Sequence, residues 1–156
     1  MIYLKGIMTY RRFEDLPVWQ EAIRLAELRD VFLEAVGDRL RRGKQDPLDR
    51  CSLSVSNNIA EGFERGTTKE LLAFLYIARG SAGETRSMMH LLARATRLSP
   101  WADQIDAIAM SAESCGRQLH SWAGSLQNST IAGQRHQTVP THAAAPKCRR
   151  PPQSEI

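Results

Sequence analysis

The sequence predicts an all-α protein, an antiparallel up-and-down four-helix bundle followed by a disordered C-terminal tail. Proline and glycine are scarce between residues 15 and 127, where apolar residues recur at the spacing of amphipathic helices. No segment alternates apolar and polar residues as a half-buried strand does. Four long amphipathic stretches with short connectors pack most simply as an antiparallel bundle.

The first helix is expected to begin near Asp15, because Pro17 suits a first helical turn, and to end near Gly37. Arg29 falls within its apolar stripe, so it needs an acidic partner or a path by which its charge reaches solvent. The stripe consists of Val18, Ala22, Leu25, Phe32 and Val36.

The second helix is expected to begin at Asp46, an N-cap residue followed by Pro47 at the first helical position. It is expected to end near Gly62 or Gly66. Its stripe consists of Leu48, Ser52, Val55, Ile59 and Phe63.

The third helix is expected to begin at Thr67, where Glu70 completes a capping box, and to continue to about Leu98. Two of its faces are apolar, so each of them must be shielded from water by other parts of the protein or by another subunit. The first face consists of Leu71, Phe74, Leu75, Ala78, Ala82, Met89 and Leu92. The second consists of Leu72, Tyr76, Ile77, Gly80, Gly83, Leu91 and Ala95. The bundle covers one face, and another subunit is a candidate cover for the other.

The fourth helix is expected to start at Ser99 as a cap, followed by Pro100. Its stripe consists of Trp101, Ile105, Ile108, Ala112, Cys115, Leu119, Trp122 and Leu126. These elements divide the chain into an N-terminal extension (1–12), the bundle (13–127) and a tail (128–156). The tail has almost no large apolar groups and is therefore expected to be disordered.

Composition argues against several function classes. The formal net charge is +4, yet residues 11–127 are neutral overall, so the basic excess belongs to the ends of the chain. No membrane span or secretory signal is recognisable, and a cytoplasmic location is expected. The three widely spaced cysteines predict neither a zinc site nor a disulfide framework. No Glu-x-x-His pair, nucleophile elbow or glycine-rich phosphate loop is found, so we expect no metal, no cofactor and no enzymatic activity.

Two groups of basic residues are candidates for contacts with nucleic-acid phosphates. The first connector contains Arg39, Arg41, Arg42 and Lys44. The third helix contributes Arg79, Arg86, His90 and Arg97, whose spacings of seven, four and seven residues place them on one line. That line is either a solvated, salt-bridged face or a phosphate-contacting stripe.

Polar residues also border the stripe of the second helix. Ser54, Asn58 and Glu61 share one side of that helix, and Gly62 follows directly. The group makes either structural polar contacts between helices or subunits, with Gly62 allowing a turn or a close approach, or a binding site. As a hypothesis, Glu61 pairs with Arg29 or Arg79.

Three motifs carry a family resemblance: FEDLPVWQEAIRLA (13–26), SVSNNIAEGFERG (54–66) and FLYIARGSAGE (74–84). In their order and spacing, residues 11–126 resemble the four-helix-bundle proteins encoded in intervening sequences of bacterial 23S ribosomal RNA genes. That family is similar to the accessory variability determinant of diversity-generating retroelements. The resemblance implies an up-and-down bundle, ring-shaped homo-oligomers, typically pentamers, and no known enzymatic activity. The related determinant binds nucleic acid and a reverse transcriptase.

Three functional hypotheses follow. The first is a non-enzymatic homo-oligomeric scaffold or binding module, whose partner is a structured nucleic acid, RNA or DNA, or another protein such as a reverse transcriptase. The second is a purely structural or protein–protein assembly without nucleic-acid contact. The third is an unrecognised enzyme, which the missing catalytic motifs disfavour.

Overall fold

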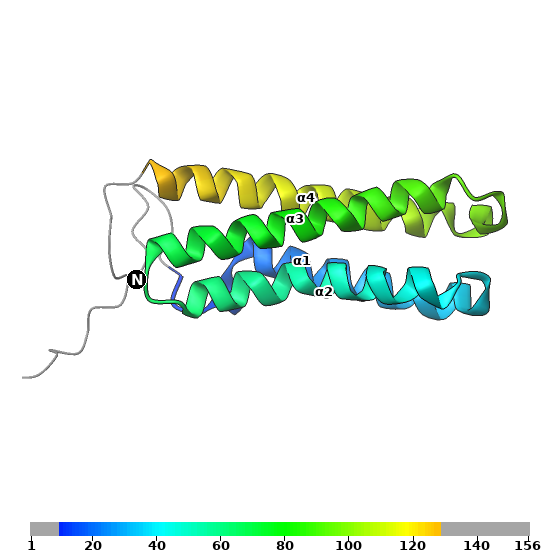
Figure 1. Cartoon of the computed structure of the whole chain (residues 1–156), viewed down its shortest axis with the longest axis horizontal. Helices are drawn as coiled ribbons and strands as arrows, with labels where there is room; N and C mark the ends of the chain where they lie inside the picture. Colours follow the sequence, from blue (N-terminus) through cyan, green and yellow to red (C-terminus); the bar gives the residue numbers. More distant parts are fainter. Residues whose placement is uncertain (1–9, 129–156) are drawn as a thin grey trace, which may run out of the picture.

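The structure, a computed structural model, describes residues 10–128 and consists of four long helices in up-and-down order (Figure 1). The helices are α1 (Pro17–Val36), α2 (Arg42–Glu64), α3 (Thr68–Ala93) and α4 (Ala102–Gln127). Short 3-10 helices are η1 (Phe13–Asp15), η2 (Gly37–Arg39) and η3 (Thr96–Trp101). The described residues contain no strand, and the predicted all-α antiparallel four-helix bundle is confirmed. Most of the predicted extension and tail lies outside the described residues.

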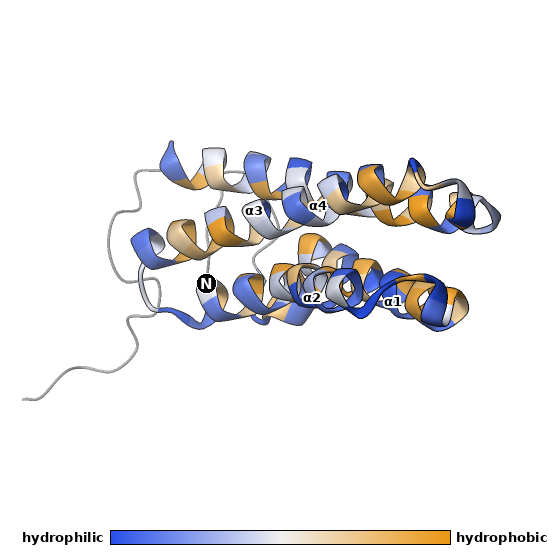
Figure 2. Ribbon diagram, turned by 45° about the vertical axis from the view of Figure 1, so that its right-hand side comes forward, coloured by the Kyte–Doolittle hydropathy of each residue, from blue (hydrophilic) through white to orange (hydrophobic). Residues whose placement is uncertain are grey.

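A single apolar core runs along the inside of the bundle. Each helix packs against two others: α1 and α3 each contact both α2 and α4. Figure 2 shows apolar and hydrophilic residues intermixed along every helix, as amphipathic helices require. The predicted stripes of α1 and α2 are buried throughout, and those of α3 and α4 are buried except for partly exposed Phe74, Trp101 and Trp122. The pattern of the sequence therefore located the core correctly.

The start of α2 differs from the prediction. The helix begins at Arg42, about one turn before Asp46, so that Pro47 lies inside it. The cause is the connector, where Leu40 is only 1% exposed and anchors the chain in the core. The amide of Gln45 donates to the carbonyls of Gly37 (2.9 Å) and Leu40 (2.6 Å), which holds the first turn of α2 against the connector.

The junction between α3 and α4 also differs from the prediction. α3 ends at Ala93, not near Leu98, and α4 begins at Ala102, after the turn that contains Pro100. Leu98 is 1% exposed, so the junction also places an apolar anchor in the core. That anchoring requires the chain to leave the α3 axis, and a 3-10 turn takes the place of the predicted helix.

The junction between α2 and α3 follows the predicted capping box. Thr67 caps α3: its hydroxyl accepts from the Glu70 backbone N–H (3.2 Å) and donates to the Glu70 carboxylate (2.7 Å). Gly62 lies in the last turn of α2, where a Cβ atom would approach the Cβ of Phe74 to 2.7 Å. Of the two roles considered for Gly62, the structure shows the close approach of a neighbouring helix.

Candidate nucleic-acid interface

The α1–α2 and α3–α4 connectors lie side by side at one end of the bundle (Figure 1). Two contacts join them, although their residues are about 60 positions apart. The Nε of Arg97 donates to the backbone carbonyl of Arg39 at 3.3 Å. The guanidinium of Arg39 lies over the ring of Trp101, 5.4 Å from its centroid. The up-and-down topology has therefore brought both segments into one surface.

This surface is strongly basic. We call it the basic end, and its cations are Arg39, Arg41, Arg42, Lys44, Arg94 and Arg97. Asp38 is the only acid within residues 37–45, and residues 90–101 contain none. None of the six cations forms an ion pair with another described residue. A bundle that is neutral overall thus concentrates positive charge at one end.

The backbone beneath these cations is held by the fold. Leu40 and Leu98 anchor the two connectors in the core, each 1% exposed. Gln45 bonds two carbonyls of the first connector, and Arg97 bonds a third. The side chains of the cations are exposed, except for the partly buried Lys44. Charged groups on an anchored backbone lose less conformational freedom when a ligand binds.

The predicted line along α3 is not continuous. Arg79, Arg86 and His90 lie on α3, but Arg97 lies on η3, because the helix ends at Ala93. Arg97 therefore joins the first connector, while Arg79 and Arg86 are exposed along the length of α3. The prediction of one stripe is wrong in this respect.

Sequence reasoning also missed a member of the basic end. Arg94 is the residue directly after α3, and it is exposed at the start of the α3–α4 connector. It lies off the helical line that selected the other arginines. The signal that would have found it is the excess of basic over acidic residues in that connector.

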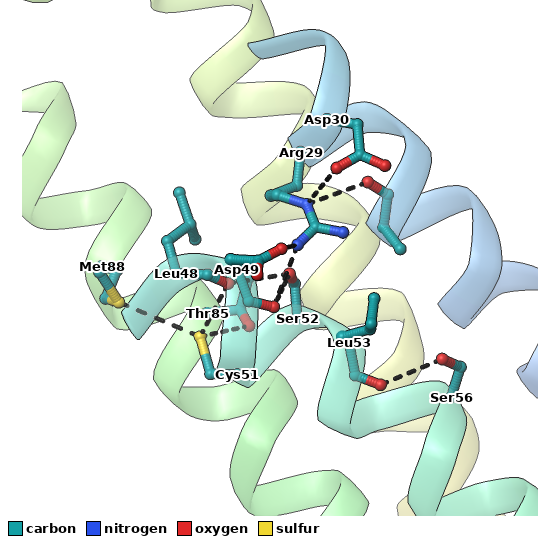
Figure 3. A network of polar contacts seen from close by, with 11 residues as sticks. Arg29, Asp30, Leu48, Asp49, Cys51, Ser52, Leu53, Ser56, Thr85 and Met88 are labelled. Carbon is teal, nitrogen blue, oxygen red and sulfur yellow. Dashed lines mark hydrogen bonds and ion pairs between the residues drawn. The ribbon is translucent and has the colours of Figure 1, made fainter. Parts of the chain in front are cut away.

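The ion pairs proposed for Glu61 are wrong. Glu61 pairs with Arg65, four residues later and directly after the end of α2, at 2.5 Å. Arg29 pairs instead with Asp49 and with Asp30 (3.0 Å), as Figure 3 shows. Residues four apart on a helix meet directly, and α1 is antiparallel to α2, so Arg29 faces the start of α2.

The residue Arg29 is 1% exposed, and its side chain sits in a network of polar contacts (Figure 3). Its Nε donates to the carbonyl of Ala26 (3.3 Å), and a terminal nitrogen donates to the carbonyl of Asp49 (3.0 Å) as well as to the Asp49 carboxylate. The sequence required either an acidic partner for this cation or a path to solvent, and the structure supplies two acidic partners. The network joins α1 to α2 and has a structural role.

The polar border of α2 lies along the seam with α3. The hydroxyls of Ser54 and Ser81 are 2.9 Å apart, and the amide of Asn58 donates to the carbonyl (2.7 Å) and hydroxyl (2.9 Å) of Ser54. The outer surface of α2 beside them is a shallow hollow, lined in part by Asp46, Arg50 and Leu53. No nucleophile and base are paired there, so this hollow does not have the arrangement of a catalytic site.

The described cysteines are buried and unreactive in character. Cys51 accepts a hydrogen bond from the Thr85 hydroxyl (3.2 Å), and burial raises the pKa of its thiol. Burial and the nearby Glu21 carboxylate raise the pKa of Cys115 to about 12. Both thiols are therefore protonated near neutral pH, where a nucleophilic cysteine needs its thiolate. Within residues 10–128 no three side chains of His, Cys, Asp or Glu gather where they could hold a metal ion.

The second apolar face of α3 is largely uncovered in the single chain. Tyr76, Ile77 and Leu91 are 44%, 51% and 54% exposed, and Gly80 and Gly83 beside them are exposed as well. The amide of Gln127 donates to the Tyr76 hydroxyl at 2.5 Å and steadies one edge of the face. None of the described helices has the length and apolar character that a membrane crossing needs.

Comparisons with known proteins agree with this fold. A family model described as "23S rRNA-intervening sequence protein" matches residues 14–121. The chain is similar to a crystal structure of a protein of unknown function from the S23 ribosomal protein family of Bacteroides thetaiotaomicron VPI-5482. The two share 20% sequence identity with a TM-score of 0.61, over 68% of this chain and 97% of the other. At that identity the likeness is one of fold. A comparison with curated proteins found no match.

Proposed function

This chain belongs to the family of 23S rRNA-intervening sequence proteins, and we propose that it is a non-enzymatic module that binds structured nucleic acid and assembles with copies of itself. The basic end carries the proposal. Its six cations lack ion-pair partners among the described residues, and they stand on the two anchored connectors or, for Arg42 and Lys44, on the first turn of α2. Neither the family nor the similar structure indicates an enzyme.

Phosphate contact is the chemistry that such a surface favours. Exposed guanidinium groups bind phosphate oxygens strongly, often through two parallel hydrogen bonds. Each phosphate that is neutralised releases counterions from the nucleic acid, so affinity falls steeply as salt rises. The acidic residues of the domain lie mainly outside the two connectors, so the positive potential is directed at one end.

Self-assembly is the second part of the proposal, and the open face of α3 supports it. Exposed Tyr76, Ile77 and Leu91 beside two glycines form an apolar surface that a neighbouring subunit would cover. A ring, which the family resemblance implies to be a pentamer, would repeat the basic end once per subunit. Repetition converts weak phosphate contacts into strong binding where several subunits reach the same RNA.

The test is a binding titration of the full chain with a fluorescent stem–loop RNA across a range of salt concentrations. We expect log affinity to fall linearly with log salt. The double variant Arg41→Ser, Arg42→Ser should weaken binding and make the slope shallower, by roughly 0.7–0.9 for each phosphate that the variant no longer neutralises. The matched control is Arg24→Ser, Arg117→Ser, which removes the same charge from the sides of α1 and α4. Absent binding at low salt, or an equal loss of affinity in the control, contradicts the proposal.

A purely structural or protein–protein assembly is the second candidate function. The open α3 face favours it independently of the basic end. Light scattering of the protein alone and with RNA separates the two candidates. A stable oligomer whose mass is unchanged by RNA, at low salt, supports the structural assembly and contradicts nucleic-acid binding.

A further inference from the structure

The pair formed by Arg39 and Trp101 distinguishes the basic end from an ordinary cluster of positive charge. The Arg39 guanidinium lies 5.4 Å from the centroid of the Trp101 ring. The indole is partly buried and packs against the core, which fixes the orientation of the ring. Arg39 itself is exposed, so its guanidinium is covered by the indole and open to solvent elsewhere. The result is a planar cationic surface held at the tip of the bundle.

Two backbone contacts keep this pair in place. The Arg39 carbonyl accepts from Arg97, and the N–H of Leu40 donates to Gly37 at 3.3 Å, which closes the turn containing Arg39. Trp101 is the last residue of η3, directly before α4, so its backbone is tied to a long helix. The pair therefore bridges the two connectors, with a rigid element behind the tryptophan.

We propose that the Arg39–Trp101 pair is a stacking platform for an unpaired base, so that the basic end prefers looped or single-stranded segments of a folded RNA over continuous duplex. Bases that leave a helix stack on aromatic rings and on arginine guanidinium planes. A fully paired duplex keeps its bases stacked inside and offers only phosphates and groove edges. The neighbouring Arg41, Arg42 and Arg97 are placed to contact the phosphates that flank such a base. This inference rests on the proposed nucleic-acid binding and names the part of the nucleic acid that is recognised.

The chain contains a natural control for this platform. At the opposite end of the bundle, Arg65 lies over the ring of Phe74, 5.2 Å from its centroid. Arg65 is bound there by Glu61 (2.5 Å) and Glu70 (3.8 Å). Those two carboxylates repel phosphates, so a similar arginine–aromatic pair is expected to take no part in RNA binding.

The experiment compares two RNA probes with equal numbers of phosphates, a stem–loop whose loop is all adenosine and a fully paired duplex. The wild-type full chain should bind the stem–loop more tightly. Arg39→Lys keeps the charge but removes the planar surface, so it should weaken stem–loop binding by about tenfold while duplex binding changes little. Arg39→Ser removes the charge too and should weaken binding of both probes. Arg65→Lys should leave both affinities unchanged.

The outcomes separate the platform from the proposed function. If both RNAs bind with a clear salt dependence but Arg39→Lys binds the stem–loop as the wild type does, the platform is wrong and nucleic-acid binding stands. If neither RNA binds at low salt, both are wrong. If Arg65→Lys weakens stem–loop binding as much as Arg39→Lys does, the assignment to this end is wrong. Because Arg39 is exposed, its variants should keep the wild-type thermal unfolding midpoint, which circular dichroism checks for each protein.

Discussion

Arg29 is among the largest side chains that the bundle buries completely. Its position in the apolar stripe of α1 was enough to predict that it needs an acidic partner or a path by which its charge reaches solvent. The identity of that partner was not predictable, because it depends on how far α1 is shifted along α2. Glu61 was a wrong candidate for this reason, whereas Asp49 lies in the part of α2 that faces Arg29. The sequence thus shows that a buried charge needs a partner more readily than it shows which residue that partner is.

Removing the Asp49 carboxylate should destabilise the protein. Asp49→Ala leaves Arg29 with one carboxylate, so we expect the free energy of unfolding to fall by about 1–2 kcal/mol. The effect is smaller than for a fully buried pair because the Asp49 side chain is 59% exposed and Asp30 remains. Urea unfolding followed by circular dichroism measures it. The control Asp46→Ala, one turn earlier on the exposed side of α2, should change stability little; an equal effect of both substitutions would refute the assigned role.

The helix interiors were predictable, and three of their boundaries were not: the start of α2, the end of α3 and the start of α4. The core stripes follow from helical periodicity alone, and the capping box at Thr67 follows from a local pattern of two residues. The start of α2 and the junction before α4 depend on Leu40 and Leu98, which the fold draws into the core. No local sequence signal distinguishes such an apolar anchor in a connector from one more residue of a helical stripe.

The packing of α2 against α3 should be sensitive to one added methyl group. In Gly62→Ala the new Cβ would lie 2.7 Å from the Phe74 Cβ, so the helices must separate. We expect unfolding free energy to fall by about 1–2 kcal/mol despite the better helix propensity of alanine. Gly116→Ala is the matched substitution on α4, where no atom of a neighbouring helix lies within 4 Å of the added Cβ. It should be neutral or stabilising by up to about 1 kcal/mol, and a comparable destabilisation there would contradict the close-approach explanation.

At the scale of the molecule, topology decides which candidate site residues meet. An up-and-down bundle places its first and third connectors at one end, so Arg39 and Arg97 come together although the sequence grouped Arg97 with α3. Arg79 and Arg86 remain on the side of α3. The predicted fold class already implied this meeting of connectors. The contact between Arg39 and Trp101 could not be predicted from the sequence, because it depends on the 3-10 turn that replaces the predicted start of α4.

Self-assembly through α3 is testable with one charged residue. Ile77→Lys places a charge on the open apolar face, and we expect at least a tenfold weaker association of subunits. Light scattering over a concentration series measures the change, with circular dichroism to verify that the helices remain. Met110→Lys is the control, because Met110 is 70% exposed on α4. If the wild type is a monomer at every concentration, or if both variants dissociate alike, the α3 face is not the subunit interface.

The bundle begins and ends on the same side, opposite the basic end (Figure 1). An even number of antiparallel helices returns the backbone to the side where it entered, so the start of α1 and the end of α4 both lie far from the connector tip. A chain tethered to a sensor surface or fused to a carrier through either of these positions would therefore present its arginine-rich tip outward. The same geometry gives the elongated bundle two different ends, one where an attachment can be made and one that carries the positive charge.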